Sequence, residues 1–307
     1  MKKDLISIKD LTTAEIEDIF LLTDKLKKDK AKFSKVLQGK TLALIFQKPS
    51  NRTRVSFEVG MCQLGGNSIY LGPGEINLGV RESVRDVAKT LSRYVNAIVL
   101  RTFEHENILE MAKSASVPVI NGLSDFSHPC QALADVYTVR EKFKSMKGVT
   151  LAYVGDGNNV CNSLMFASAK VGLKMNIATP KGYEPDKSVV KEAKAIAQSK
   201  ESFINLFNSP TEAVKGADVI YTDVWASMGQ EKEAAERKDI FKDFQVNKNL
   251  VGLAKKKVFI MHCLPAHRGE EITGEVIDSR NSIVFDQAEN RMHVQKAILI
   301  ALLSDKG

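Results

Sequence analysis

The chain has 307 residues, of which 44% are hydrophobic and 26% charged, and its formal net charge is +7 at pH 7. This composition excludes a disordered, collagen-like or disulfide-scaffold protein, and the length predicts about two domains. A positive net charge permits an anionic partner without choosing one. With 7% aromatic residues, the chain lacks the basic and aromatic interleaving that is typical of nucleic-acid binding. We therefore expect no nucleic-acid partner.

The cysteines are scattered, and no long apolar stretch is present. Cys62, Cys130, Cys161 and Cys263 form no CxxC pair, which favours reduced thiols in a cytoplasmic enzyme. No stretch approaches the roughly 20 apolar residues of a membrane-spanning helix. The first residues, MKKDLISIKDLTTAEIE, lack the apolar core of a secretory signal. We expect a cytoplasmic protein with no membrane partner.

Strands alternate with helices along the first half of the chain. Thr12 and Glu15 have the spacing of a capping box, which predicts the start of the first helix. Short apolar runs predict strands at 41–46, 68–72, 97–100 and 117–121. Helical periodicity follows the segments 50–54 and 128–131 and covers Val84 to Tyr94. This alternation indicates a parallel sheet with helical crossovers.

The same alternation restarts near Gly148. Strands are predicted at 150–155, 174–179, 217–225, 257–265 and 282–287, and a final helix from about Glu289 to Ser304. We therefore predict an α/β fold with two similar-sized domains, residues 1–138 and 139–288, each a parallel sheet flanked by helices. In such sheets, ligands bind beyond the carboxyl ends of the strands. The unusual polar clusters of this sequence all follow predicted strands.

The first cluster is Ser50-Asn51-Arg52-Thr53-Arg54, between a strand and a helix. A helix start offers unpaired N–H groups and a partial positive charge, so it readily binds an anion. Two arginines, two hydroxyls and the preceding Lys48 would complete a phosphate site. The alternative is a helix cap with two solvated arginines, and five consecutive polar residues favour the functional interpretation.

The second cluster is His128-Pro129-Cys130-Gln131, and Arg101 ends a neighbouring predicted strand. His and Gln side chains can both donate to a carbonyl oxygen that gains charge during acyl transfer. Taken singly, each residue also fits a structural role: a lone histidine is more often a hydrogen-bond donor in the fold, and Arg101 fits a surface position.

The segment Gly155-Asp156-Gly157-Asn158-Asn159 resembles the opening of a dinucleotide-binding fingerprint. Val160 occupies the position of the third glycine, and no acidic residue stands about 20 residues further on. This disfavours a nicotinamide-dependent dehydrogenase and favours a tight turn that presents Asn side chains to a ligand. Asp223, at the end of a later strand, suits a substrate ammonium group, and the simplest role of Trp225 is core packing.

The segment from His262 to Gly269 allows three interpretations. Zinc is disfavoured, because His262 and Cys263 are adjacent and project to opposite sides of a strand, and no CxxC or HExxH motif supports a metal site. A Cys–His nucleophile is the second interpretation. The third is a loop that positions an amine through the thiol and backbone carbonyl groups.

Seven motifs, in this order, resemble those of the aspartate/ornithine carbamoyltransferase family, over nearly the whole chain. They are SNRTR (50–54), RTF (101–103), HPCQALAD (128–135), GDGNN (155–159), DVWASMG (223–229), HCLPAHRGEE (262–271) and ENRMHVQKA (289–297). DVWASMG and HCLP resemble the ornithine branch. The resemblance implies transfer of the carbamoyl group of carbamoyl phosphate to the δ-amine of ornithine, by a homotrimer that needs no metal or cofactor. It also implies that the C-terminal helix, residues 289–307, packs back on the first domain.

The resemblance also implies roles for individual residues. Carbamoyl phosphate binding is implied for Ser50, Asn51, Arg52, Thr53, Asn77, Arg101, His128, Pro129, Cys130, Gln131, Cys263, Leu264 and Arg291. Ornithine binding is implied for Asn159, Asp223, Ser227 and Met228, and catalysis for Arg52, Arg101, His128, Gln131 and Cys263. Two positions depart from the family pattern, since Asn51 replaces the usual Thr and Asn77 replaces a frequent Gln. The segment GVRESVRD (79–86) is a candidate for reaching a neighbouring subunit's site.

Overall fold

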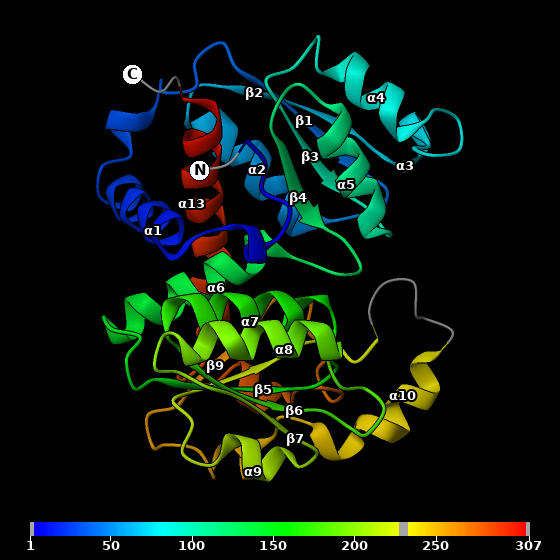
Figure 1. Ribbon diagram of the computed structural model, residues 1–307. Helices are drawn as coiled ribbons and strands as arrows, with labels where there is room; N and C mark the ends of the chain where they lie inside the picture. Colours follow the sequence, from blue (N-terminus) through cyan, green and yellow to red (C-terminus); the bar gives the residue numbers. More distant parts are fainter. Residues whose placement is uncertain (1–2, 227–232, 305–307) are drawn as a thin grey trace. The chain divides into compact units, whose positions relative to one another are not determined.

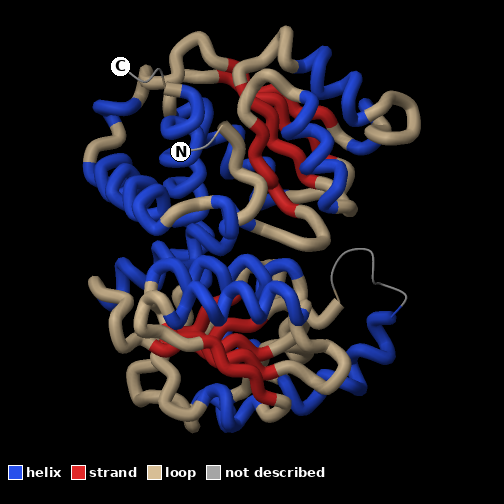
Figure 2. The backbone as a smooth tube through the Cα atoms, viewed as in Figure 1, coloured by secondary structure: helices blue, strands red, loops and turns tan. Residues whose placement is uncertain are grey.

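The computed structural model describes residues 3–226 and 233–304, and the chain divides into two compact units (Figure 1). Unit 1 comprises residues 1–137 and 289–307, and unit 2 comprises residues 138–288. The chain passes from unit 1 to unit 2 within helix α6 (Pro129–Phe143) and returns within helix α13 (Val284–Leu303). Each unit is a parallel sheet flanked by helices (Figure 2), which confirms the predicted α/β fold.

The sheet of unit 1 has four parallel strands in the order β2-β1-β3-β4. The strands are β1 (Thr41–Phe46), β2 (Asn67–Leu71), β3 (Ala97–Arg101) and β4 (Val119–Leu123). The central strands β1 and β3 are apolar and buried almost throughout, as expected for strands covered on both faces. Because β1 and β3 pair in parallel with Phe46 opposite Arg101, the chain segments that follow both strands leave the sheet at the same edge.

The first helix of unit 1 starts with the predicted capping box. The Thr12 hydroxyl accepts a hydrogen bond from the Glu15 N–H at 3.1 Å, and the Glu15 carboxylate accepts one from the Thr12 N–H at 2.8 Å. The helices of this unit are α1 (Thr13–Lys28), α2 (Asn51–Gln63), α3 (Pro73–Ile76), α4 (Val84–Leu91) and α5 (His105–Ser114), with short 3₁₀ helices η1 (Ile8–Asp10) and η2 (Ala31–Phe33).

The helices of unit 1 lie on both faces of its sheet. Helices α4 and α5 pack on the face that carries Ile45 and Leu100. Helix α13 packs with α2 in the same unit (Figure 1), where the Lys296 Nζ donates to the Gln63 Oε1 at 2.9 Å. The C-terminal helix therefore packs back on the first unit, as expected.

The sheet of unit 2 has five parallel strands in the order β7-β6-β5-β8-β9. The strands are β5 (Thr150–Val154), β6 (Lys174–Ala178), β7 (Ile204–Phe207), β8 (Val219–Thr222) and β9 (Phe259–His262). Helices α7 (Asn159–Val171) and α8 (Lys187–Gln198) lie on one face, and α9 (Pro210–Val214) on the other (Figure 1). The remaining elements are α10 (Ala234–Phe241), η4 (Lys242–Phe244), α11 (Lys248–Val251) and α12 (Gly274–Ile277).

The predicted strand at 282–287 is wrong. Ser282 forms a single β-bridge with Ile260, and helix α13 begins at Val284. The fifth strand of unit 2 is instead β7, which the sequence analysis did not predict. An apolar run as short as Ile283–Phe285 fits a strand or a helix equally well, whereas β7 is a four-residue edge strand with two exposed residues and gives a weak signal.

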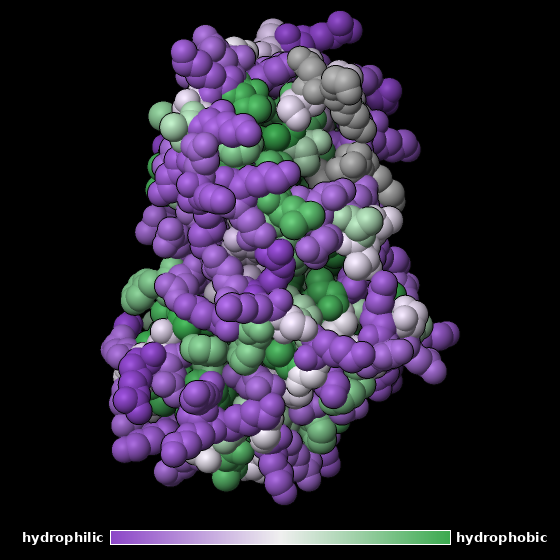
Figure 3. Space-filling model, turned by 90° about the vertical axis from the view of Figure 1, so that its left-hand side faces the viewer, coloured by the Kyte–Doolittle hydropathy of each residue, from purple (hydrophilic) through white to green (hydrophobic). Residues whose placement is uncertain are grey.

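In the described part of the chain, no helix has the length and apolarity needed to cross a bilayer. Figure 3 shows a face on which hydrophilic side chains cover most of the surface, with hydrophobic ones in small groups between them.

Candidate active site

The segment after β1 begins helix α2 with a side-chain cap. Ser50 is the N-cap residue, and its Oγ accepts a hydrogen bond from the Thr53 N–H at 3.2 Å. The N–H groups of a first helical turn point along the axis and carry partial positive charge. Arg52 and Thr53 therefore stand at a helix start beyond the carboxyl end of a central strand, as predicted, while Asn51 is exposed.

Two arginines from distant parts of the sequence meet at Thr53, and one of them also contacts His128. The Arg101 Nη1, at the end of β3, lies 3.4 Å from the Thr53 Oγ1. The Arg291 Nη2, from α13, donates to the same oxygen and lies 3.3 Å from the His128 Nε2. All four side chains are buried. Buried cations in such proximity repel one another, so an anion bound between them would stabilise the arrangement.

The surroundings of His128 hold its imidazole neutral. Burial lowers the pKa of His128 well below its usual value, and the charges of Arg291, Arg101 and Arg52 lower it further. A guanidinium can only donate, so the His128 Nε2 that faces Arg291 accepts, and the proton of the ring resides on Nδ1. A neutral imidazole with a defined N–H is suited to donate a hydrogen bond to a substrate oxygen.

Two further predicted residues of unit 1, Lys48 and Cys130, are buried. Lys48 is buried, and its Nζ lies 4.0 Å from the centre of the Phe103 ring. Cys130 is also buried, and burial raises the pKa of its thiol to about 12. Its Sγ lies 3.7 Å from the Asn121 carbonyl oxygen. Cys130 is therefore a protonated packing residue and not a nucleophile.

Gln131 follows His128 in the first turn of α6. Its Nε2 donates to the Asp135 carboxylate at 2.8 Å, one helical turn further on. Its Oε1 is buried and has no hydrogen-bond partner among the described residues. The sequence predicts that Gln131 donates to a carbonyl oxygen, whereas the amide atom without a partner among the described residues is an acceptor.

Asn77 does not join the arginine cluster. It is exposed and ends helix α3 with φ 43° and ψ 55°, in the left-handed region. Asn tolerates this conformation better than Gln, which gives a backbone reason for the amide at this position. Its proposed contact with carbamoyl phosphate stays a prediction.

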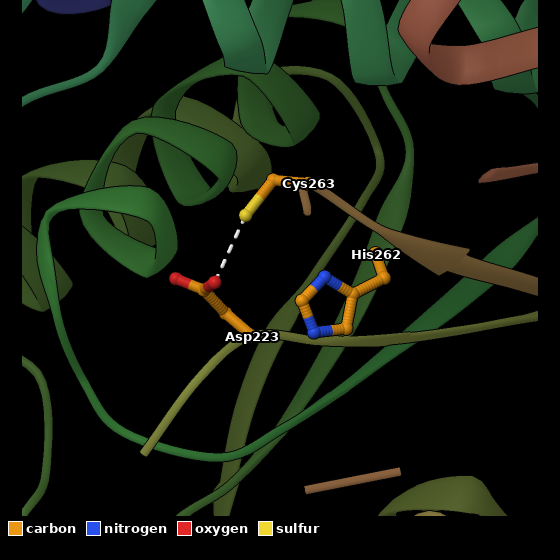
Figure 4. A group of neighbouring side chains, drawn as sticks. All are labelled: Asp223, His262 and Cys263. Atoms are coloured by element: carbon orange, nitrogen blue, oxygen red, sulfur yellow. Dashed lines mark hydrogen bonds between the residues drawn. The ribbon is translucent and has the colours of Figure 1, made fainter. Parts of the chain in front are cut away.

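A second polar cluster lies in unit 2 around Asp223, just beyond β8 (Figure 4). The Cys263 Sγ donates to the Asp223 Oδ1 at 2.9 Å, and the Asn158 Nδ2 donates to the Oδ2 at 3.0 Å. The Val224 N–H also donates to Oδ1, at 2.9 Å. Three hydrogen bonds thus orient the buried Asp223 carboxyl group at the carboxyl end of the sheet, a position that suits a cationic ligand.

Asn158 also shapes the start of helix α7. Its Oδ1 accepts from the N–H groups of Val160 and Cys161 at 3.0 and 3.1 Å, while its Nδ2 reaches Asp223. The preceding residue must be glycine, because a Cβ on Gly157 would lie 2.3 Å from the Pro185 nitrogen. Asn159, the predicted ornithine ligand, is the first residue of α7.

His262 holds the loop that follows β9. Its Nδ1 accepts from the Leu264 N–H at 2.8 Å, and its Nε2 donates to the buried Glu271 at 3.0 Å. The backbone N–H of His262 donates to the Gln287 Oε1 at 3.0 Å. Leu264 has φ 60° and precedes a cis peptide bond to Pro265. A bulky residue with positive φ is unusual, and these hydrogen bonds keep it in that conformation.

This geometry bears on the metal and nucleophile interpretations. Ligand atoms of Asp223, His262 and Cys263 lie within 4.8 Å of one another, but both ring nitrogens of His262 already have partners. A metal ion would have to break one of those bonds. A thiol that donates to a carboxylate is protonated, and His262 has no nitrogen left to deprotonate it. The arrangement therefore favours the third interpretation, a loop that positions an amine.

Comparison with known proteins gives each half of the chain a match to a domain of one family. Residues 3–141 match the carbamoyl-P binding domain, and residues 147–302 the Asp/Orn binding domain, of aspartate/ornithine carbamoyltransferases. The chain belongs to the aspartate/ornithine carbamoyltransferase family.

Individual members of this family resemble the chain over almost its full length. It is 58% identical over 304 residues to the ornithine carbamoyltransferase of Pyrococcus horikoshii, covering 98% of this chain and 96% of that one. The anabolic ornithine carbamoyltransferase of Pyrococcus furiosus is 56% identical, with the same coverage. A solved structure of the Pyrococcus furiosus enzyme matches with a TM-score of 0.95 and 55% identity, covering 99% of this chain and 98% of that one.

Some predicted residues of the family pattern gather in the described structure, and two lie outside it. In unit 1, Arg101 and Arg291 contact Thr53, Arg291 also contacts His128, and the charge of Arg52 lowers the pKa of His128. Asp223, Cys263 and Leu264 lie together in unit 2. Ser227 and Met228 fall outside the described residues.

Several residues that hydrogen-bond to the candidate site or to the loops around it were not predicted from the sequence. They include Asn158, Glu271, Gln287 and Arg237. Arg237 is buried, and its Nη1 donates to Asp156 at 3.0 Å and to the Trp225 carbonyl at 2.9 Å, while its Nε donates to Glu233 at 3.1 Å. Asn158 carried a signal, because an Asn directly before a helix is a typical cap. The other three gave none, since their role depends on contacts far along the sequence.

Proposed function

We propose that this chain transfers the carbamoyl group of carbamoyl phosphate to the δ-amine of L-ornithine, giving L-citrulline and phosphate. The observation that supports this most is the meeting of Arg101 and Arg291 at Thr53, at the start of α2 and beside a neutral His128. Close relatives named ornithine carbamoyltransferase support the same reaction.

The arginine cluster of unit 1 would bind the acyl donor. Arg52, Thr53 and the N–H groups of the first turn of α2 would hold the phosphate, with Ser50 and Asn51 at its edge. Arg101 and the Nδ1–H of His128 would direct hydrogen bonds at the carbonyl oxygen, where negative charge develops. Arg291 carries a third guanidinium to the same point, so the cluster neutralises the phosphate as it departs.

The Asp223 cluster of unit 2 would bind the acceptor. Asp223 would take the α-ammonium group of ornithine, and Asn159 with Ser227 and Met228 would complete the grip on its backbone end. Cys263 and Leu264 would line the path of the δ-amine. Because Cys263 is a hydrogen-bond donor to Asp223 at 2.9 Å, its role is to fix the carboxylate rather than to form an acyl intermediate.

The reaction follows from these positions. The lone pair of the neutral δ-amine forms a bond to the carbonyl carbon, and the negative charge moves to the carbonyl oxygen. The bond from that carbon to the phosphate oxygen then breaks, and the departing phosphate takes the proton released by the amine. Holding both reactants in place removes much of the entropic barrier to their encounter.

A panel of amines tests the acceptor. We expect ornithine to be used far better than putrescine, which has no carboxylate, and than N-acetylornithine, which has no α-ammonium group for Asp223. Initial rates of carbamoyl transfer, with carbamoyl phosphate saturating, provide the comparison. Faster turnover of putrescine than of ornithine would refute the assignment of the acceptor.

We also propose that the chain forms a homotrimer. Val55 and Val59 lie one turn apart on α2 and are 48% and 37% exposed, and Ile69 on the edge strand β2 is 50% exposed. Val80, in the segment 79–86 that is our candidate for reaching a neighbour, is 81% exposed. Exposed apolar groups of this kind favour association. Light scattering coupled to size-exclusion chromatography should give about three times the chain mass, and a monomer would contradict the proposal.

Two further proposals concern the setting of the reaction. We propose a cytoplasmic location, because all four cysteines are free and reduced thiols are typical of that compartment.

We propose the biosynthetic direction, towards citrulline for arginine, because the Pyrococcus furiosus relative is named anabolic. An equilibrium assay cannot separate the directions, but a KM for ornithine far above that for citrulline would contradict this choice.

A further inference from the structure

Asp135 lies one turn after Gln131 on α6 and is fully buried. Its Oδ1 accepts a hydrogen bond from the Gln131 Nε2 at 2.8 Å. Gln131 is 2% exposed, and its Oε1 has no hydrogen-bond partner among the described residues. A buried amide oxygen without a partner is costly in a folded protein, so its position calls for an explanation.

The chemistry of the pair fixes the orientation of the amide. An ionised carboxylate only accepts hydrogen bonds, whereas a glutamine amide has one donating and one accepting end. If the amide of Gln131 rotated by half a turn, two oxygens would face each other across 2.8 Å. Asp135 therefore keeps the Gln131 Nε2 turned towards its carboxylate. The Gln131 Oε1 then points away from Asp135 and can accept a hydrogen bond from a donor.

We propose that Asp135 is a positioning residue for the carbamoyl group, acting through Gln131. This proposal rests on the proposed function, because the donor that the Gln131 Oε1 would meet is the NH₂ group of carbamoyl phosphate. Asp135 touches neither substrate. It holds Gln131 as a hydrogen-bond acceptor, so that the site recognises a carbamoyl end and discriminates against an acyl end that carries a methyl group.

Three ligands separate this role from a general structural one. Phosphonoacetamide carries a stable carbamoyl-like amide, phosphonoacetone has a methyl group in place of the NH₂, and inorganic phosphate has neither. Calorimetric titration of the full chain gives the dissociation constant of each. The variants are Asp135→Asn, which has both a donor and an acceptor, and Gln131→Met, which has neither.

We expect both variants to weaken phosphonoacetamide binding by about tenfold, the contribution of one hydrogen bond. Binding of phosphonoacetone and phosphate should change by less than about twofold, and the double variant should lose no more than either single one, because both act on the same contact. Asp24→Asn is the matched control. The Asp24 carboxylate, on α1, accepts a hydrogen bond at 2.8 Å from the hydroxyl of Tyr137, which lies on α6 as Asp135 does. The Asp24→Asn substitution should leave the dissociation constants of all three ligands unchanged.

An exchanged pair keeps the test decisive if Asp135→Asn unfolds. In Gln131→Glu combined with Asp135→Asn, the asparagine amide can donate to the new carboxylate, which again presents an acceptor to the ligand. The preference for phosphonoacetamide over phosphonoacetone should then return to within about threefold of the wild-type value.

The positioning role is overturned if Asp135→Asn weakens the binding of all three ligands equally, or if it leaves phosphonoacetamide binding unchanged. Either result leaves the proposed function intact. A wild-type chain that binds none of the three ligands would instead overturn the proposed function, and this inference with it.

Discussion

At the residue scale, Arg52 tests the phosphate site most simply. We predict that Arg52→Ala weakens carbamoyl phosphate binding at least about 100-fold, because it removes two charge-assisted hydrogen bonds of about 1.5–3 kcal/mol each. Arg54→Ala is the control, since Arg54 pairs with Glu58 at 3.0 Å and stacks on Tyr70 at the surface. Calorimetry measures both, and circular dichroism checks the fold. Normal donor binding by Arg52→Ala would refute the assignment.

Cys263 separates direct transfer from a covalent intermediate. We predict that Cys263→Ala retains measurable turnover and mainly raises the KM for ornithine, by about tenfold, because the thiol fixes Asp223 and one hydrogen bond contributes about that much. Mass spectrometry of the wild type during turnover should find no added carbamoyl mass on Cys263. An adduct on that residue, with complete loss of turnover in the variant, would establish the nucleophile instead.

His128 makes stability depend on pH in a defined direction. Its folded pKa lies below the ordinary value of about 6.5, so the unfolded chain binds the proton more readily. The stability contributed by the neutral imidazole is complete above about pH 6.5 and is lost as the pH falls from there towards the folded pKa. His128→Asn should therefore show a smaller loss of unfolding free energy between pH 7.5 and 5.5 in urea titrations. Equal losses in both proteins would contradict the buried neutral state.

At the scale of elements, two helix caps of the same kind should behave differently. Thr12 caps α1 and Ser50 caps α2, each through a hydroxyl that accepts a backbone N–H. Replacing either by Ala should cost about 1 kcal/mol in unfolding free energy. Ser50→Ala alone should also raise the KM for carbamoyl phosphate, because α2 starts at the phosphate site. A rise of the same size in Thr12→Ala would show that α2 has no special role.

Helices and strands with strong local signals were predicted from the sequence, and those without such signals were not. Strand β1 was predicted at its observed ends and helix α1 at its observed start, since a buried apolar run and a capping box are local signals. Strand β7 was missed and a strand was expected where α13 begins, because a short edge strand and a helix start inside an apolar run are decided by neighbours far away in sequence.

The two polar clusters likewise contain residues that the sequence predicts and residues that it does not. The polar clusters after β1, β3, β8 and β9 were predictable, because the carboxyl ends of parallel strands meet at one edge. Family motifs added Arg291, which no local pattern connects to Thr53. The contacts that orient these groups were not predictable from the sequence. Examples are the hydrogen bonds of His262 to Glu271 and of Gln131 to Asp135. Each is an ordinary acidic residue until the fold brings it to its partner.

For the whole molecule, the reaction should depend on the protonation of its acceptor. The δ-amine of ornithine has a pKa near that of lysine, about 10.4, so the reactive neutral amine increases about tenfold per pH unit near neutrality. The value of kcat/KM for ornithine should therefore rise between pH 7 and pH 8, while carbamoyl phosphate binding stays nearly constant. Initial rates at fixed ionic strength measure this. A flat profile would mean that a protonated amine, or another step, limits the reaction.

The most direct test of the whole account follows both products of one turnover. Carbamoyl phosphate labelled with ¹³C at its carbonyl carbon is mixed with ornithine and the enzyme, and ¹³C and ³¹P NMR spectra are recorded together. After subtraction of the uncatalysed breakdown of carbamoyl phosphate, we predict that labelled citrulline and free phosphate appear in equal amounts. At subsaturating carbamoyl phosphate, both should form at least about 100-fold more slowly when Arg52→Ala replaces the wild type. Release of phosphate without citrulline would identify a hydrolase and contradict the proposed transfer.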